Sequence, residues 1–135
     1  MICRFKFSSQ AFRNDGAAFN SGNEGEKIVL ADLIKKFGSA RVKWTSAENP
    51  DVSVPTNEYD FEIFDKAIKN VLYFVDSKST TTRKYQTDKT EIYWRNSEWR
   101  FIEEQADSNY LIARVFNVNS PNPEIVYIKV NREDI

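Results

Sequence analysis

Asp76 and Lys78 are the residues of this sequence best spaced to act together in chemistry. They lie two positions apart at the end of the segment 71–78 (VLYFVDSK), which is apolar up to Asp76. In a strand, side chains two residues apart point to the same face, so the carboxylate and the amine emerge side by side above Leu72 and Phe74. We expect Lys78 to be open to solvent there. The alternative for this pair is a structural ion pair at a strand edge.

A second carboxylate, Asp60, lies in the preceding strand-like segment 59–64, where apolar and polar side chains alternate. The residues predicted to share one face of this strand are Tyr59, Phe61 and Ile63. If the two segments are neighbours in a sheet, Asp60 and Asp76 converge on one cation. Two carboxylates with backbone carbonyls and waters suit Mg²⁺, which prefers oxygen ligands. The alternative for Asp60 is an ordinary solvated strand residue.

A helix is predicted over 24–37, because apolar residues recur there at helical spacing, and Gly38 fits the position after its last turn. The residues of the apolar stripe are Leu30, Leu33, Ile34 and Phe37. Glu26 follows the same stripe, so we expect it to point toward the sheet, where it could orient a water or bind a second ion. The alternative is a capping role. The capping boxes that fit the helix start are Ser21 with Glu24 and Asn23 with Glu26.

The composition excludes several classes of site. The chain has 135 residues, with 19 basic and 20 acidic residues and a net charge of −1, which is typical of one soluble domain. It has no histidine and one cysteine, Cys3, which excludes Ser-His-Asp and Cys-His catalysis, His-ligated zinc and a disulfide framework. Without a secretory signal pattern or a membrane-length apolar run, we expect a cytoplasmic protein that does not contact membranes.

The remaining patterns predict an α/β (mixed α+β) fold with a central mixed β-sheet flanked by helices. Residues 1–21 are expected to form an N-terminal strand (near 3–7) and arm, and residues 22–135 to form the domain. The stretch 8–23 is predicted to be a loop or poorly ordered arm. The elements expected after the first helix are, in order, strands at 42–44, 59–64 and 71–78, a helix at 96–106, and strands at 110–118 and 124–130.

Two family resemblances follow from these residues. Asp60, then Asp76-Ser77-Lys78 on the next strand, with a helical Glu26 before them, resembles the PD-(D/E)XK restriction-endonuclease-like superfamily, although Tyr59 stands where that superfamily usually has proline. A narrower resemblance is to the NO VEIN C-terminal domain family. That family is of unknown function, and its members lie at the ends of larger proteins, many of them in bacterial anti-phage and restriction systems.

The segments that carry the narrower resemblance occur in the same order as in the family. They are Gly25-Glu26, Glu58-Tyr59-Asp60-Phe61-Glu62, Val75-Asp76-Ser77-Lys78-Ser79-Thr80, Asn96-Ser97-Glu98-Trp99 and Asn109-Tyr110-Leu111. The chain departs from the family at Asp76, where glutamate is usual, and at Arg95, where serine is frequent. Both departures leave the chemistry that the resemblance implies possible.

The resemblance implies a Mg²⁺- or Mn²⁺-dependent nuclease domain that hydrolyses DNA phosphodiester bonds in anti-phage or restriction defence. Asp60, Asp76 and the Ser77 carbonyl would bind the metal ion. Lys78 would stabilise the attacking hydroxide or the pentacoordinate phosphorus, and Glu26 would orient the water or share a second ion. The alternatives are a non-catalytic nucleic-acid-binding or sensor module and a protein-interaction module with the same fold.

A local excess of positive charge indicates where DNA, or alternatively RNA, would bind. Residues 78–100 hold six basic and three acidic residues in a chain that is slightly acidic overall. The side chains expected to contact the phosphate backbone are Ser79, Thr80, Arg83, Lys84 and Arg95. The alternative for the basic residues is a solvated face. A homodimer, or a larger parent or partner protein, is also expected from the resemblance.

Overall fold

The computed structural model describes residues 16–56, 58–81, 96–104 and 109–130, with the side chains of 16–22 left undescribed. Its elements are α1 (Gly16–Phe37), the 3₁₀ helix η1 (Ser39–Arg41), β1 (Val42–Trp44), β2 (Phe61–Phe64), β3 (Val71–Ser79), α2 (Asn96–Glu104), β4 (Tyr110–Phe116) and β5 (Glu124–Lys129). The predicted order of helix, three strands, helix and two strands is confirmed. Neither described α-helix has the length and apolarity that crossing a membrane requires.

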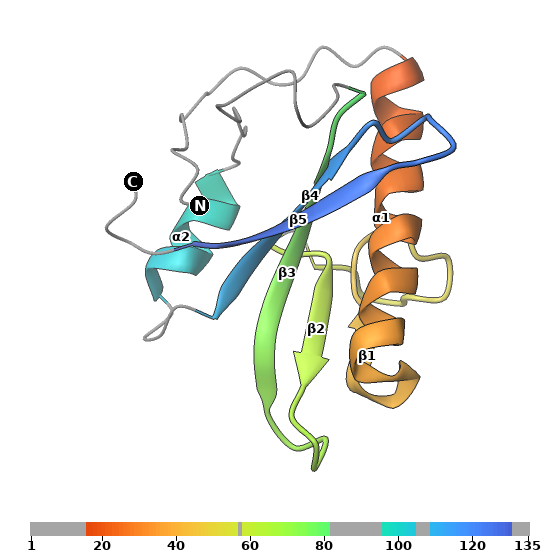
Figure 1. Ribbon diagram of the computed structural model, residues 1–135. Helices are drawn as coiled ribbons and strands as arrows, with labels where there is room; N and C mark the ends of the chain where they lie inside the picture. Colours follow the sequence, from red (N-terminus) through yellow and green to blue (C-terminus); the bar gives the residue numbers. More distant parts are fainter. Residues whose placement is uncertain (1–15, 57, 82–95, 105–108, 131–135) are drawn as a thin grey trace.

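The five strands form one mixed sheet in the order β1-β2-β3-β4-β5 (Figure 1). All neighbouring pairs are antiparallel except β3 and β4, which are parallel. A parallel pair needs a long crossover connection, and α2 lies in that connection. The prediction of a central mixed sheet flanked by helices is therefore confirmed.

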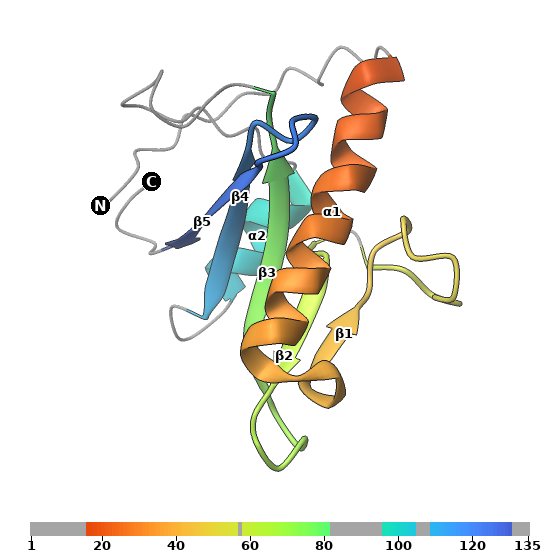
Figure 2. The same cartoon turned by 45° about the vertical axis from the view of Figure 1, so that its right-hand side comes forward.

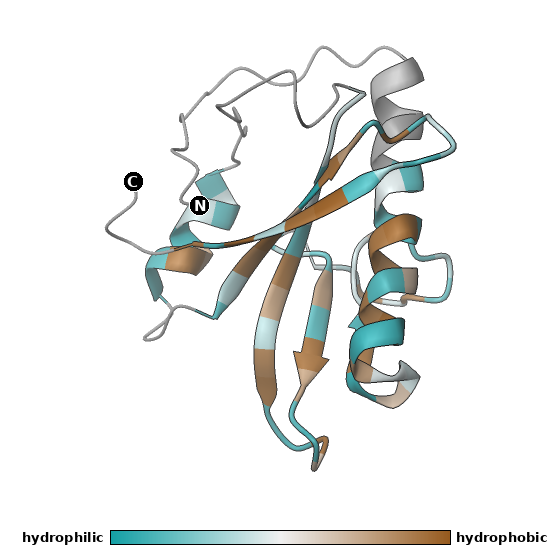
Figure 3. Cartoon of the chain, viewed as in Figure 1, coloured by the Kyte–Doolittle hydropathy of each residue, from teal (hydrophilic) through white to brown (hydrophobic). Residues whose placement is uncertain are grey.

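The two helices cover opposite faces of the sheet. Figure 2 shows α1 crossing in front of the strands and α2 behind them. The α1 face buries Val29 and Leu33 against apolar side chains of β2, β3 and β4, while the α2 face buries Ile102 against Tyr110 and Ile112. Apolar bands along the strands and along part of α1 mark these two cores (Figure 3). Each face of the sheet therefore has its own core, and a site at the end of a strand can receive side chains from both helices.

The loop predicted over 8–23 is wrong for residues 16–23, which are the first turns of α1. Helix propagation costs little once a helix is anchored, and the alanines at 17 and 18 favour it. Neither predicted capping box forms at the helix start, because the residues of both boxes lie inside the helix. The end of α1 is as predicted: Gly38 has a φ of 87°, and its N–H donates to the Ile34 carbonyl at 2.8 Å.

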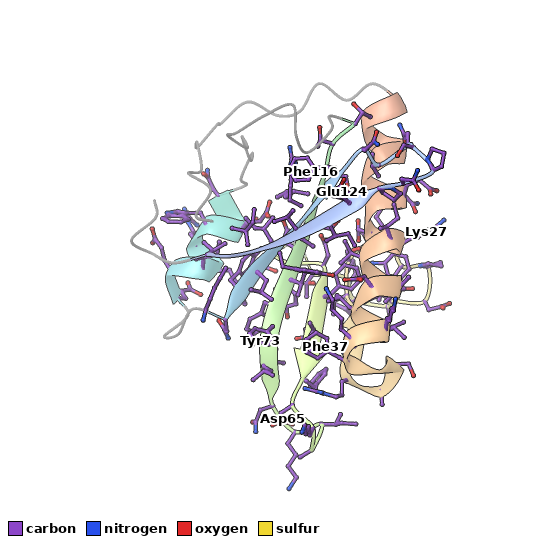
Figure 4. The ribbon with its side chains drawn as sticks, viewed as in Figure 1. Lys27, Phe37, Asp65, Tyr73, Phe116 and Glu124 are labelled. Atoms are coloured by element: carbon purple, nitrogen blue, oxygen red, sulfur yellow. The ribbon has the colours of Figure 1, made fainter. Side chains whose placement is uncertain are left out.

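The apolar face of α1 is rotated from the predicted stripe. Val29 and Leu33 are its most buried residues, while Ile34 is 38% exposed and does not widen the stripe as predicted. The buried row continues to Phe37, whose ring lies beside that of Tyr73 on β3, with 6.5 Å between the centroids (Figure 4). Glu26 lies one turn before Val29 and two turns before Leu33, so the helix turns its carboxylate toward the sheet.

Two details of the strands also differ from the prediction. Tyr59 packs in the α2-side core, whereas Phe61 and Ile63 pack in the α1-side core. The two-residue alternation breaks before Phe61, because the Asp60 N–H and Phe61 both pair with Val75. The run 71–75 is apolar on both faces, as expected of a strand that is covered on both sides, but the start of β3 is not covered in this way: Leu72 is 42% exposed.

Candidate active site

The site lies where β2 ends and β3 continues. β3 pairs with β2 only as far as Val75, but it pairs with β4 as far as Ser79. Among the described residues, no strand therefore lies beside one edge of β3 beyond Val75. Asp60 occupies the start of this edge: its N–H donates to the Val75 carbonyl at 2.9 Å, and its Oδ2 accepts the Ser77 N–H at 2.8 Å. The edge is thus bound by a carboxylate in place of a strand.

Asp60 and Asp76 are brought together, as predicted. Their side chains lie close enough to interact directly. Burial raises the pKa of Asp60 well above its usual range, and the charges of Asp76 and Glu26 raise it further, against the lowering effect of the Ser77 N–H. Asp60 therefore holds its proton to a higher pH than an exposed aspartate does.

Lys78 lies beside this pair, enclosed between two acids. Its Nζ is 3.0 Å from Asp76 Oδ2, and it donates to both carboxylate oxygens of Glu98, at 3.1 and 3.0 Å. Its side chain is only 20% exposed, so the expectation that Lys78 is open to solvent is wrong. Burial alone would lower the pKa of Lys78, but the two acids raise it above its ordinary value. The amine is therefore a fixed cation.

Glu98 is a site residue that the sequence analysis did not single out. It lies in the first turn of α2, and its residue is 2% exposed. Burial raises the pKa of Glu98 to about 8, with a further contribution from Asp76 and an opposing one from Lys78. A signal existed: Glu98 and Ile102 are four apart, so the predicted helix already placed this acid on the face of its buried isoleucine.

Glu26 reaches the site from the opposite face of the sheet. Its Oε1 accepts the Trp44 indole N–H at 2.9 Å and the Ser46 hydroxyl. Burial raises the pKa of Glu26, the hydrogen bonds from Ser46 and Trp44 counteract this, and the charges of Glu48 and Asp76 add to it. Two partners that sequence analysis missed, Trp44 and Ser46, thus hold this acid within electrostatic range of Asp76.

The backbone near Ser77 fits the predicted ligand role of its carbonyl. The N–H and C=O of one strand residue point to the same side, and the Ser77 N–H points to Asp60. The Ser77 carbonyl therefore faces the same edge of β3. The Ser77 hydroxyl, in contrast, is buried on the α1 side, and no residue that the structure describes forms a hydrogen bond with it.

The predicted phosphate-contacting residues have different outcomes. The Ser79 hydroxyl is buried against Gly25 of α1, so the expectation that it faces a substrate is wrong; α1 approaches β3 too closely there. Thr80 extends β3, since its N–H donates to the Val115 carbonyl at 2.8 Å, and its side chain is partly exposed. The calls that lie outside the described residues are Arg83, Lys84 and Arg95.

The acids of this site could hold a magnesium ion that has only a few protein ligands. Within the described part of the chain, no group of three or more acidic, histidine or cysteine side chains forms a ready ligand set. Mg²⁺ is commonly held by one or two carboxylates with waters and substrate phosphates. The Asp60–Asp76 pair offers two carboxylates, and a cation would relieve the repulsion between them.

Replacement of Lys78 by methionine is expected to destabilise the protein by about 3–5 kcal/mol, because it leaves buried Asp76 and Glu98 without their common cation. Urea unfolding at pH 8 measures the loss. In the variant with both Lys78→Met and Glu98→Gln, part of the stability should return, because one uncompensated charge is gone. Equal stability of Lys78→Met and the unchanged protein would contradict the ion-pair geometry.

Comparison with known proteins finds a family model that covers the residues of this site. The family model described as "Protein NO VEIN, C-terminal" matches residues 25–128. The matched range begins at Gly25, beside Glu26, and includes Asp60, Asp76, Lys78 and Glu98. No curated protein and no solved structure matches the chain.

Proposed function

This chain belongs to the NO VEIN C-terminal family, and from that premise we propose that it is a Mg²⁺- or Mn²⁺-dependent nuclease domain that hydrolyses DNA phosphodiester bonds. The observation that carries the proposal is the buried Asp60–Asp76 pair at the edge of β3, with the Lys78 amine 3.0 Å from Asp76. Two acids and one amine at a strand edge are suited to hydrolysing an anionic ester. A role in anti-phage or restriction defence is part of the proposal.

The charge of the cluster supports a divalent cation. Four acids (Glu26, Asp60, Asp76 and Glu98) gather around Asp76 there, and Lys78 is a cation among them. Burial raises the pKa values of Glu26, Asp60 and Glu98, and repulsion between the acids raises them further. A divalent cation held by Asp60 and Asp76 would relieve this repulsion, which makes the pair a suitable receptor for Mg²⁺.

Each residue has a distinct role in the proposal. Asp60 and Asp76 hold the ion, with the Ser77 carbonyl on the same edge. A bound Mg²⁺ supplies a coordinated water of lowered pKa and neutralises charge on the phosphate. Lys78 stays protonated and stabilises the negative charge that develops on the phosphoryl oxygens. Glu26, fixed by Trp44 and Ser46, orients a water from the α1 side.

Cleavage of single- and double-stranded DNA with Mg²⁺ or Mn²⁺ tests the proposal. We expect Asp76→Asn and Lys78→Met to reduce the cleavage rate by roughly a hundredfold or more, because each removes a group that acts on the transition state. Matched control variants are Asp51→Asn and Lys129→Met, which change exposed residues outside the cluster and should cut at the unchanged rate. A protein inert on every DNA, or active after Asp76→Asn, contradicts the proposal.

A non-catalytic nucleic-acid-binding module is the second candidate, and the enclosure of Lys78 favours it. An amine held by Asp76 and by both oxygens of Glu98 has less freedom to reach a phosphate than an open one. Salt-dependent DNA binding without cleavage under any metal condition would select this candidate. Cleavage that depends on Asp76 would exclude it.

A further inference from the structure

Glu98 makes a buried contact with Lys78 through both of its carboxylate oxygens, which a surface ion pair rarely does. Both of its carboxylate oxygens accept hydrogen bonds from Lys78, at 3.1 and 3.0 Å, and its side chain is 3% exposed. A buried bidentate carboxylate fixes the position of an amine more strictly than a single contact, because the flexible lysine side chain loses its freedom to rotate away.

The helix that carries Glu98 is anchored directly beneath the acids. The Phe101 ring of α2 meets the Phe74 ring of β3 edge-on, with 4.9 Å between the centroids, and Ile102 is buried in the same core. Phe74 lies two residues before Asp76 on the same face of β3. The distance between α2 and Asp76 is therefore set by core packing, and Glu98 has a fixed position relative to the acids.

We propose that Glu98 is a positioning residue that holds the Lys78 amine at the Asp60–Asp76 pair during the reaction, an inference that rests on the proposed function. When a cation shares the charge of Asp76, the attraction between Asp76 and Lys78 weakens. Glu98 comes from α2 and lies near Asp76, but the two hydrogen bonds that it accepts from the Lys78 amine do not depend on Asp76. It therefore continues to hold the amine when Asp76 is engaged elsewhere.

The kinetic test compares Glu98→Gln with Glu104→Gln, an exposed position on the same helix. We expect Glu98→Gln to lower kcat by roughly tenfold to a hundredfold, as small misplacements of reacting groups do, with unchanged KM for DNA and unchanged Mg²⁺ affinity by calorimetry. Glu104→Gln should match the unchanged protein. In a Lys78→Met background, Glu98→Gln should add no further loss, because the group that it positions is absent. Independent, additive losses would overturn the proposal.

A second readout does not depend on cleavage. Amine acetylation of Lys78, followed by mass spectrometry, should proceed several-fold faster in Glu98→Gln than in Glu104→Gln, because the amine is released from one of its two acids. Equal acetylation rates would overturn the positioning role even if the protein cuts DNA. If the protein cuts no DNA but Lys78 is acetylated faster in Glu98→Gln, the nuclease proposal is overturned, while the conclusion that Glu98 holds Lys78 stands. If Glu98→Gln does not fold, Glu98→Asp, which keeps the charge on a shorter side chain, gives the same comparison.

Discussion

Asp60→Asn is expected to stabilise the metal-free protein at pH 8 while abolishing Mg²⁺ binding and DNA cleavage. The asparagine keeps an oxygen for the Ser77 N–H but removes a charge that Asp76 and Glu26 repel. A gain of about 1 kcal/mol would raise the unfolding midpoint by roughly 3–6 °C in a domain of this size. Cleavage should fall by about a hundredfold or more, because one of the two metal-binding carboxylates is lost.

The raised pKa of Asp60 also predicts the direction in which the stability of the metal-free protein changes with pH. The pKa of Asp60 is raised in the folded protein, so between its ordinary value and its folded value the folded state holds a proton that the unfolded state has released. The free energy of unfolding of the metal-free protein therefore falls as the pH rises through this range. Asp60→Asn should reduce that slope, and urea unfolding at several pH values measures it.

Added Mg²⁺ separates the two effects of the same substitution. The unchanged protein should gain stability with Mg²⁺ concentration, because only the folded state gathers the two acids. Asp60→Asn should not respond, and Asp51→Asn should respond as the unchanged protein does. A Mg²⁺-dependent midpoint in Asp60→Asn, or a loss of stability without metal, would contradict the description of Asp60 as a strained metal ligand.

Gly25→Ala is expected to destabilise the protein and to displace Glu26. A Cβ at Gly25 would lie 1.6 Å from Ser79 Oγ and 2.8 Å from Ser79 Cβ. Alanine normally improves a helix by about 1 kcal/mol over glycine, but overpacking costs about 1–3 kcal/mol, and contacts this short belong at the upper end. The clash should win, by roughly 1–2 kcal/mol, and move α1 away from β3.

A second substitution tests the cause. Ser79→Gly removes both contacting atoms, so Gly25→Ala combined with Ser79→Gly should be more stable than Gly25→Ala alone, despite the cost of glycine in a strand. Gly25→Ala combined with Ser79→Ala, which leaves the Cβ of residue 79 in place, should recover less stability. Urea unfolding and Mg²⁺ calorimetry on the four proteins measure stability and the site together. A harmless Gly25→Ala would show that α1 does not need this close approach.

The acids on β3 and before β2 were predictable because strand geometry fixes which side chains share a face. Asp76 and Lys78 needed only the two-residue repeat, and Asp60 needed only neighbouring strands. The start of α1 and the side of Tyr59 were not predictable in the same way. Helix propagation into residues 16–23 depends on tertiary anchoring, and the side of Tyr59 depends on how Asp60 and Phe61 both pair with Val75 of β3.

The environment of Lys78 shows what a local pattern leaves open. The strand predicted its direction, but its exposure depends on α2, which follows it in the chain by about twenty residues and packs through Ile102 and Phe101. The same holds for Glu26 on the other face of the sheet. Its partners Trp44 and Ser46 come from a strand and a loop, and sequence periodicity does not predict where these lie relative to α1.

The order of strands in the sheet has a consequence for how the molecule forms. β1, β2 and β3 are consecutive antiparallel neighbours, so Glu26, Asp60 and Asp76 all belong to a unit that is complete when the ribosome has made the first part of the chain. The helix with Glu98 lies in the long crossover that follows, and the parallel partner β4 comes after it. During synthesis Glu26, Asp60 and Asp76 are therefore made before Glu98, the second acid that holds the lysine.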